Sequence, residues 1–222
     1  MLPDFTPIFA RYEALRNKAD ALFARVREAH PECVSCKEGC SDCCHALFDL
    51  SLVEAMYLHR AFEASIGYGP VRSAVIARAV EADRQAARIK RELFRAEKDG
   101  ENPATIMERA AQIKLRCPLL DDDDRCLLYA ARPVTCRVYG VPTAIGGQGH
   151  VCGFSRFEKG RAYPTIHMDR IQDMLNDLSR AIGEAAHSRF DELHATYVPL
   201  SMALLTRYDA AYLGIGPAPV EG

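Results

Sequence analysis

The most constraining feature of this chain is a dense group of cysteines near its N-terminus. Five of the nine cysteines fall within twelve residues, at Cys33, Cys36, Cys40, Cys43 and Cys44. A deprotonated cysteine is a soft donor that binds zinc and iron, and closely spaced ligands surround one metal at little loop-closure cost. The spacing therefore predicts metal ligation.

The same cysteine group is compatible with two structures that hold no metal. Steps of three and four residues between its members also fit one stripe of a helix, but Pro31 and Gly39 disfavour a helix there. Disulfides of a small secreted scaffold are the second alternative. The N-terminal residues carry no signal-peptide pattern, so we expect a cytoplasmic location in which the thiols stay reduced.

The overall charge pattern excludes some classes of partner. The chain has 222 residues and a net charge of −2, with acids and bases interspersed and no basic block that would follow a phosphate backbone. No apolar run is long enough to cross a bilayer. We therefore expect no nucleic acid and no membrane as partners, and one metal-binding domain over residues 1–222.

The apolar periodicity predicts a mainly α-helical bundle. Prolines at helix starts and a capping box from Ser51 to Glu54 mark where several helices begin. The cysteine-rich core should be irregular, with at most a small β-hairpin after Cys117. We expect a first helix that is capped by Thr6 and runs to about 29, then helices over about 52–65 and 70–98 and a short one from 103 that ends before Cys117. C-terminal helices within about 167–213 should span about 169–186 and run from 199 through Leu205 toward Tyr212.

A second set of cysteines is dispersed along the later part of the chain. Cys117 is followed by proline and Cys126 by Leu-Leu-Tyr, and Cys136 follows an Arg-Pro pair. A glycine-rich loop over 145–153 lacks the pattern of a phosphate-binding loop, so we interpret it as a backbone bend that delivers Cys152.

Together these spacings resemble one known family. The chain contains the run Cys36-x3-Cys40-x2-Cys43-Cys44, then Cys-Pro-Leu-Leu, a short acidic turn, Cys-x2-Tyr, Arg-Pro-x2-Cys-Arg and a late cysteine. This order of motifs is similar to the YkgJ-like cysteine-cluster family of CxxCxxCC type. That family is described as a zinc- or iron-chelating domain, and it resembles in part the cysteine-rich region of flagellin lysine methylases. The resemblance spans roughly Cys36 to Cys152 and leaves out a helical insertion at about 70–114.

The resemblance implies a set of ligands. Cys33 lies outside the motif but could replace Cys36, and His45 and His150 are further candidates whose role the sequence leaves open. Arg132 and Arg137 are expected just outside the ligands, as cations near a thiolate-rich centre. The implied metal ligands are Cys36, Cys40, Cys43, Cys44, Cys117, Cys126, Cys136 and Cys152.

The choice of metal is between an iron–sulfur cluster and zinc. Crowded ligands, an adjacent cysteine pair and proline after Cys117 favour iron–sulfur, with [4Fe–4S] as the expected form. We expect a role in electron transfer or in support of a modification reaction, with an unidentified protein or redox partner. The alternatives are a structural zinc module that mediates protein interaction and, from the resemblance alone, part of a protein-lysine methylation system. Whether the protein is itself an enzyme stays open.

Overall fold

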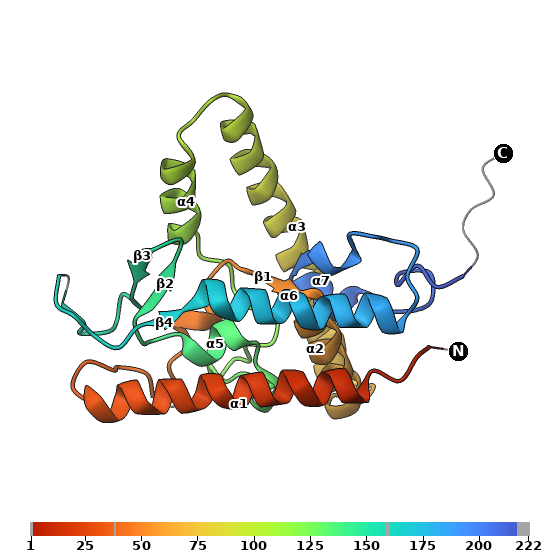
Figure 1. Cartoon of the computed structure of the whole chain (residues 1–222), viewed down its shortest axis with the longest axis horizontal. Coiled ribbons are helices and arrows are strands. Elements are labelled where there is room, and N and C mark those ends of the chain that lie inside the picture. Colours follow the sequence, from red (N-terminus) through yellow and green to blue (C-terminus); the bar gives the residue numbers. More distant parts are fainter. Residues whose placement is uncertain (1, 38, 159, 217–222) are drawn as a thin grey trace.

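The computed structural model describes residues 2–37, 39–158 and 160–216, and it is mainly helical (Figure 1). This confirms the predicted fold class. The boundaries of the first four predicted helices and of the helix near 169 hold to within a few residues, whereas the short helix at 134–138 was not predicted. The seven α-helices in this part of the chain are α1 (Thr6–Ala29), α2 (Leu52–Ser65), α3 (Pro70–Lys98), α4 (Pro103–Gln112), α5 (Val134–Val138), α6 (Met168–Ala185) and α7 (Leu200–Leu205).

Local sequence signals account for most helix starts. The Ser51 amide and hydroxyl both donate to Glu54 Oε2, at 3.2 and 2.9 Å, which is the predicted start of α2. Asn102 Oδ1 accepts from the Ala104 amide at 2.8 Å and caps α4. Two details differ from expectation: Phe5 rather than Thr6 precedes α1, and the last helix ends at Leu205.

Short strands and 3-10 turns connect the helices. The antiparallel pair β1 (Asp49–Ser51) and β5 (Tyr197–Pro199) joins the segment after the first cysteines to the start of α7. In the second sheet, β2 (Thr143–Ile145) lies between antiparallel β3 (Gln148–His150) and parallel β4 (Ile166–His167). The 3-10 helices are η1 (Asp42–His45), η2 (Tyr129–Ala131) and η3 (Leu193–Ala195).

The predicted hairpin after Cys117 is a tight turn rather than a pair of strands. One antiparallel bridge joins Leu120 to Cys126. Asp121 Oδ1 accepts from the amides of Asp123 and Arg125, at 3.0 and 2.8 Å, which closes the acidic turn between them. The turn therefore holds Cys117 and Cys126 near each other without a regular sheet.

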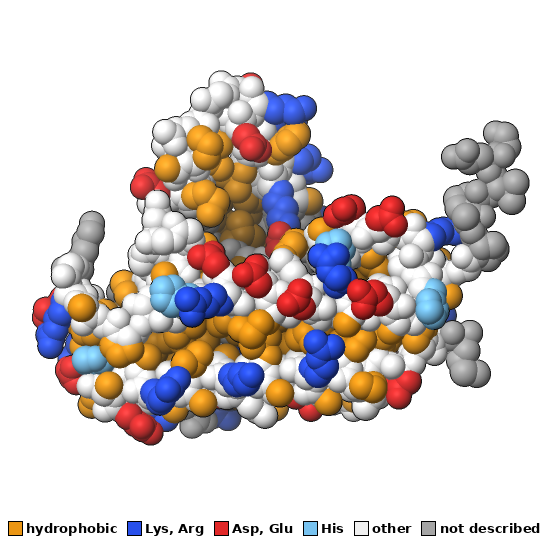
Figure 2. Space-filling model, viewed as in Figure 1, with side chains coloured by type: hydrophobic (Ala, Val, Ile, Leu, Met, Phe, Trp, Pro, Cys, Tyr) orange, Lys and Arg blue, Asp and Glu red, His pale blue; other side chains and the backbone are white. Residues whose placement is uncertain are grey.

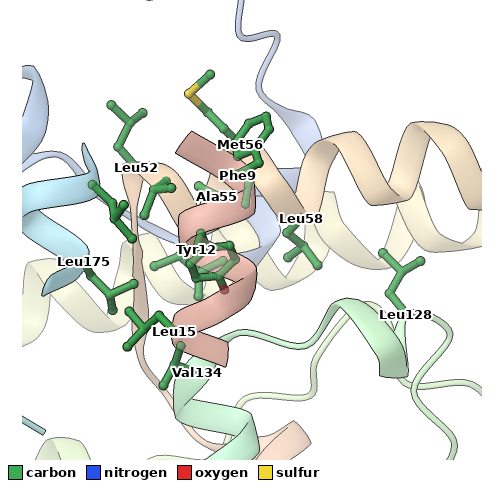
Figure 3. Packing of buried hydrophobic residues seen from close by; sticks show 14 of the residues in the cluster. Phe9, Tyr12, Leu15, Leu52, Ala55, Met56, Leu58, Leu128, Val134 and Leu175 are labelled. Atoms are coloured by element: carbon green, nitrogen blue, oxygen red, sulfur yellow. The ribbon is translucent and has the colours of Figure 1, made fainter. Parts of the chain in front are cut away.

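One cluster of buried hydrophobic side chains joins the helices of the body (Figure 3). Tyr12 and Leu15 of α1 meet Leu58 of α2, Val134 at the start of α5 and Leu175 of α6. Each of these side chains is at most 6% exposed, so their burial contributes the main stabilisation of the body. None of the described helices is long and apolar enough to cross a membrane.

Candidate metal centre

Backbone hydrogen bonds fasten the early cysteines to the later ones. The turn η1 carries Cys43 and Cys44, and the segment that follows α4 runs beside it. The Cys117 amide donates to the Cys44 carbonyl at 2.7 Å, and the Leu115 amide donates to the His45 carbonyl at 2.9 Å. These main-chain contacts thus help to place residues far apart in sequence in one compact region.

Two further elements deliver the remaining late cysteines. Pro133 precedes α5, on which Cys136 occupies the third position. The β2–β3 hairpin turns at Gly146 and Gly147, both with positive φ, and leads directly to Cys152. The glycine-rich loop therefore has the bending role that we predicted for it.

The eight predicted cysteines line two neighbouring cavities. A cavity of about 50 Å³, called here the larger cavity, is also lined by apolar side chains such as Phe48, Leu58 and Leu119. A cavity of about 10 Å³, called the smaller cavity, is closed by Tyr139 and Gly140. The thiols of the larger cavity are Cys44, Cys117, Cys126 and Cys136, those of the smaller are Cys36, Cys40 and Cys152, and Cys43 lines both.

The Cys43 sulfur is hydrogen-bonded by the thiols of two other cysteines, Cys136 and Cys44. Hydrogen bonds from the Cys136 and Cys44 thiols lower the pKa of Cys43, because they stabilise its thiolate. The same hydrogen bonds to Cys43 raise the pKa of Cys44 and of Cys136. Cys43 is therefore the thiol most readily ionised, and the two beside it hold their protons more tightly.

Backbone amides point at several of the sulfurs. Burial raises the pKa of Cys117 to about 12, while amide hydrogen bonds from Leu119 and Leu120 act in the opposite direction. At Cys152 the Phe154 amide donates to the sulfur at 3.4 Å. Such donors favour the thiolate, which is the form that binds metal, and they tune the potential of a redox centre.

A buried carboxylate lies beside the smaller cavity. The Asp42 side chain is 10% exposed and its oxygens accept from Lys114 Nζ and Tyr139 Oη, both at 3.0 Å, and from Cys152 Sγ at 3.4 Å. Burial acts to raise the pKa of Asp42, but these hydrogen bonds together hold it below its ordinary value. Sequence reasoning missed this residue, because its partners lie far away in the chain.

The two arginines of the motif differ in their surroundings. Arg132 lies against the larger cavity and stacks on Tyr129, with its guanidinium carbon 3.6 Å from the ring centroid. Its charge favours the thiolates of Cys36, Cys43 and Cys126.

Arg137 instead turns away from the thiols. Its side chain is 7% exposed and donates to Asp20 Oδ2 at 2.5 Å, to the Ala130 carbonyl at 2.6 Å and to the Arg132 carbonyl at 2.9 Å. Arg137 therefore positions the backbone of Arg132 and anchors the turn to α1.

The three residues whose role the sequence left open do not line the two cavities. Cys33 is buried, with its sulfur 3.4 Å from Glu32 Oε1. His45 Nδ1 lies 3.0 Å from the Ser41 carbonyl, and His150 is exposed on β3. None of the three is among the described residues that line the two cysteine cavities.

The donor set fits a thiophilic metal. All nine cysteines are described, and each is a free thiol. Within residues 2–37, 39–158 and 160–216, no three His, Cys, Asp or Glu side chains are yet arranged so that they could hold a metal ion. Several of the thiols are hydrogen-bonded to neighbouring groups, so ligation requires loss of their protons and rotation of side chains.

Comparisons with known proteins agree with this chemistry. No curated protein and no solved structure matched the chain. A family model did match, over residues 35–153, which is more than half of the chain and includes all eight cysteines of the two cavities. By this match the chain belongs to the CxxCxxCC family, described as a "putative zinc- or iron-chelating domain".

Proposed function

We propose that the protein is an electron-transfer protein that binds an iron–sulfur cluster at the larger cavity. The observation that supports this most is the division of the eight cysteines between two cavities of unequal volume. Four thiols surround the larger cavity besides Cys43, and four cysteines are the ligand set of a [4Fe–4S] cluster. Cys44, Cys117, Cys126 and Cys136 would hold it.

The surroundings of the larger cavity suit a redox centre. Its apolar lining excludes water, and a dry environment with amide donors to sulfur sets the potential of such a centre. Arg132 offsets part of the negative charge that four thiolates bring. A bound cluster would supply one-electron transfer, and these residues would hold it, orient it and keep water away.

A second candidate is a structural metal site at the smaller cavity. Its volume of about 10 Å³ is near the minimum that holds one water molecule, so a single ion fits its size. Cys36, Cys40, Cys43 and Cys152 would complete a tetrahedral zinc site of the structural kind. This site would fasten the first cysteine run to the β2–β3 hairpin.

Metal and sulfide analysis of anaerobically purified protein tests the proposal. We expect a brown protein with acid-labile sulfide and broad absorption at about 400 nm that a reductant bleaches. Cys117→Ser should remove iron, sulfide and colour, whereas Cys33→Ser, a control outside both cavities, should retain them. Colourless protein that holds two zinc ions per chain and no sulfide would overturn electron transfer and favour the structural module.

A further inference from the structure

Part of the chain projects from the body as a helical arm. We call the outer half of α3, from Arg84, together with α4 the arm, and Figure 1 shows the two helices rising together. The buried residues of α3 end at Ala86, and none of the ten residues of α4, all of them described, is buried. The arm therefore contributes little to the core, and its surface is available for another role.

Cations form a stripe along the arm. Arg84, Arg88, Arg91, Arg95 and Lys98 follow one another at steps of four, three, four and three residues, which keeps them on one face of α3. At 100° per residue this face is opposite the buried alanines, and the stripe is about 21 Å long. Figure 2 shows Lys and Arg side chains along one edge of the arm.

The central cations of this stripe have no ion-pair partner among the residues that the structure describes. Arg88, Arg91 and Arg95 are exposed, and none of them forms an ion pair with a carboxylate of the described residues. Arg84 has a long pair with Glu81 at 3.9 Å, and Lys98 stacks on Phe94. In a chain whose net charge is −2, this is a local positive surface that would attract an acidic partner.

A groove with a partly apolar lining meets the stripe at Arg95. Ile89 and Leu93 of α3 and Ile113 after α4 supply the apolar part of this groove of about 830 Å³. Figure 2 shows hydrophobic side chains in the hollow between the two helices. The groove also carries Glu92, Asp99 and Glu101, and Arg109 pairs with Glu101 at 2.9 Å. Its own charges are therefore mixed, and the positive character comes from the stripe.

We propose that the arm docks a partner protein through an acidic amphipathic helix. The apolar side of that helix would enter the groove, and its carboxylates would face Arg88, Arg91 and Arg95. Two features favour a protein over a nucleic acid. The stripe is mostly arginine, and Phe94 and Met107 nearby are 54% and 66% exposed, all residue types enriched at protein interfaces. None of the described residues that line the groove is aromatic, so the groove offers no platform for stacked bases.

The base of the arm is connected directly to the cysteine-rich region. The chain leaves α4 through Lys114, which pairs with Asp42 at 3.0 Å, and reaches Cys117 three residues later. Ala46 and Lys114 also form an antiparallel bridge. The base of the arm is therefore fastened beside the cysteine cavities, so a partner on the arm would be tethered to the same region. This inference depends on the surface of the arm and not on which metal is bound.

Binding of a defined peptide tests the inference. The probe is a synthetic helix with leucines on one face and glutamates on the other, titrated against the metal-loaded full chain. We expect the triple variant Arg88→Glu, Arg91→Glu, Arg95→Glu to bind it at least about tenfold more weakly, and added salt to weaken wild-type binding. The matched control reverses Arg25, Arg170 and Arg180, three exposed arginines elsewhere, and should bind as the wild type does.

Four outcomes would overturn it. One is an absence of peptide binding to the wild type. Equal loss of binding in the control triple variant would also overturn it, because only the overall charge would then matter. Another is equal affinity for a scrambled peptide of the same composition, because the groove would then contribute nothing. The last is tighter, stripe-dependent binding of single-stranded oligothymidine, which would assign the stripe to nucleic acid. Unchanged metal content and circular dichroism establish that each variant is folded.

Discussion

The Cys117 amide lies 2.7 Å from the Cys44 carbonyl and donates a hydrogen bond to it. This contact joins the first cysteine run to the second at the point where both line the larger cavity. The smaller cavity likewise combines early and late cysteines, because Cys152 lines it together with Cys36 and Cys40. Metal binding at either cavity would therefore become part of the folding free energy of both regions.

Hydrogen exchange before and after metal removal measures this coupling. We expect protection to fall together over residues 40–46 and 114–136 when the metal is chelated, because the two segments share hydrogen bonds and ligands. The amides of α6 serve as the internal reference and should change least. Loss confined to residues 33–50 would show that the two runs bind metal independently.

Cys33 and Cys40 should differ as ligands. Cys40 lines the smaller cavity, whereas Cys33 lies beside Glu32 and is buried away from both cavities. We expect Cys40→Ser to lose the metal of the smaller cavity and Cys33→Ser to retain it, with a stability cost of about 1–2 kcal/mol from the buried hydroxyl. Metal per folded chain is the measurement, and equal loss in the two variants would refute the assignment.

The absence of a side chain at Gly140 leaves room for the side chain of Cys36, a member of the cysteine motif. Its φ is +105°, and a Cβ added there would lie 3.2 Å from Cys36 Cβ and 3.6 Å from Cys36 Sγ. We expect Gly140→Ala to cost about 1–3 kcal/mol of backbone strain and to weaken metal binding at the smaller cavity about tenfold, since it displaces Cys36.

Gly147→Ala is the matched control, measured by chelator competition. Gly147 also has a positive φ, of +76°, but a Cβ there would meet nothing within 4 Å. It should be strained without any change in metal affinity. Equal metal affinity of the Gly140 and Gly147 variants would mean that Cys36 is not held by this contact.

Glu54 should make the stability of the body depend on pH. Its carboxylate accepts from Ser51 and from the Val134 amide at 3.1 Å, yet burial raises its pKa above the ordinary 4.5. A raised pKa means that the folded protein binds this proton more tightly than the unfolded chain does. The resulting stabilisation is complete below pH 4.5 and is lost as the pH rises through the raised pKa.

Glu54→Gln isolates this contribution, because glutamine preserves the capping pattern without titrating. At neutral pH the variant should be about 1–3 kcal/mol less stable, since its amide group faces a backbone donor. The difference in unfolding free energy between wild type and variant should be larger near pH 4.5 and shrink toward neutral pH. Parallel pH profiles from urea denaturation would contradict the raised pKa.

Local chemistry let the helices be predicted from sequence. The Ser51–Glu54 pair and the proline starts of α3 and α4 act within one helical turn, so the residues that decide the boundary are neighbours in the chain. The acidic turn after Leu120 likewise depends on Asp121 and the amides that follow it. The membership of the CxxCxxCC family was also readable, because its motif is a set of spacings.

The sequence by itself thus determined the helices, the family and the kind of donor atom, all properties of residue order and local spacing. Only the tertiary structure divided the cysteines between two cavities, placed Cys43 in both and turned Arg137 away toward Asp20. It also brought Asp42 to Lys114 and Tyr139 and left the cations of the arm on an exposed face. These relations depend on packing between segments that are distant in sequence, and a local pattern holds no information about which of them will meet.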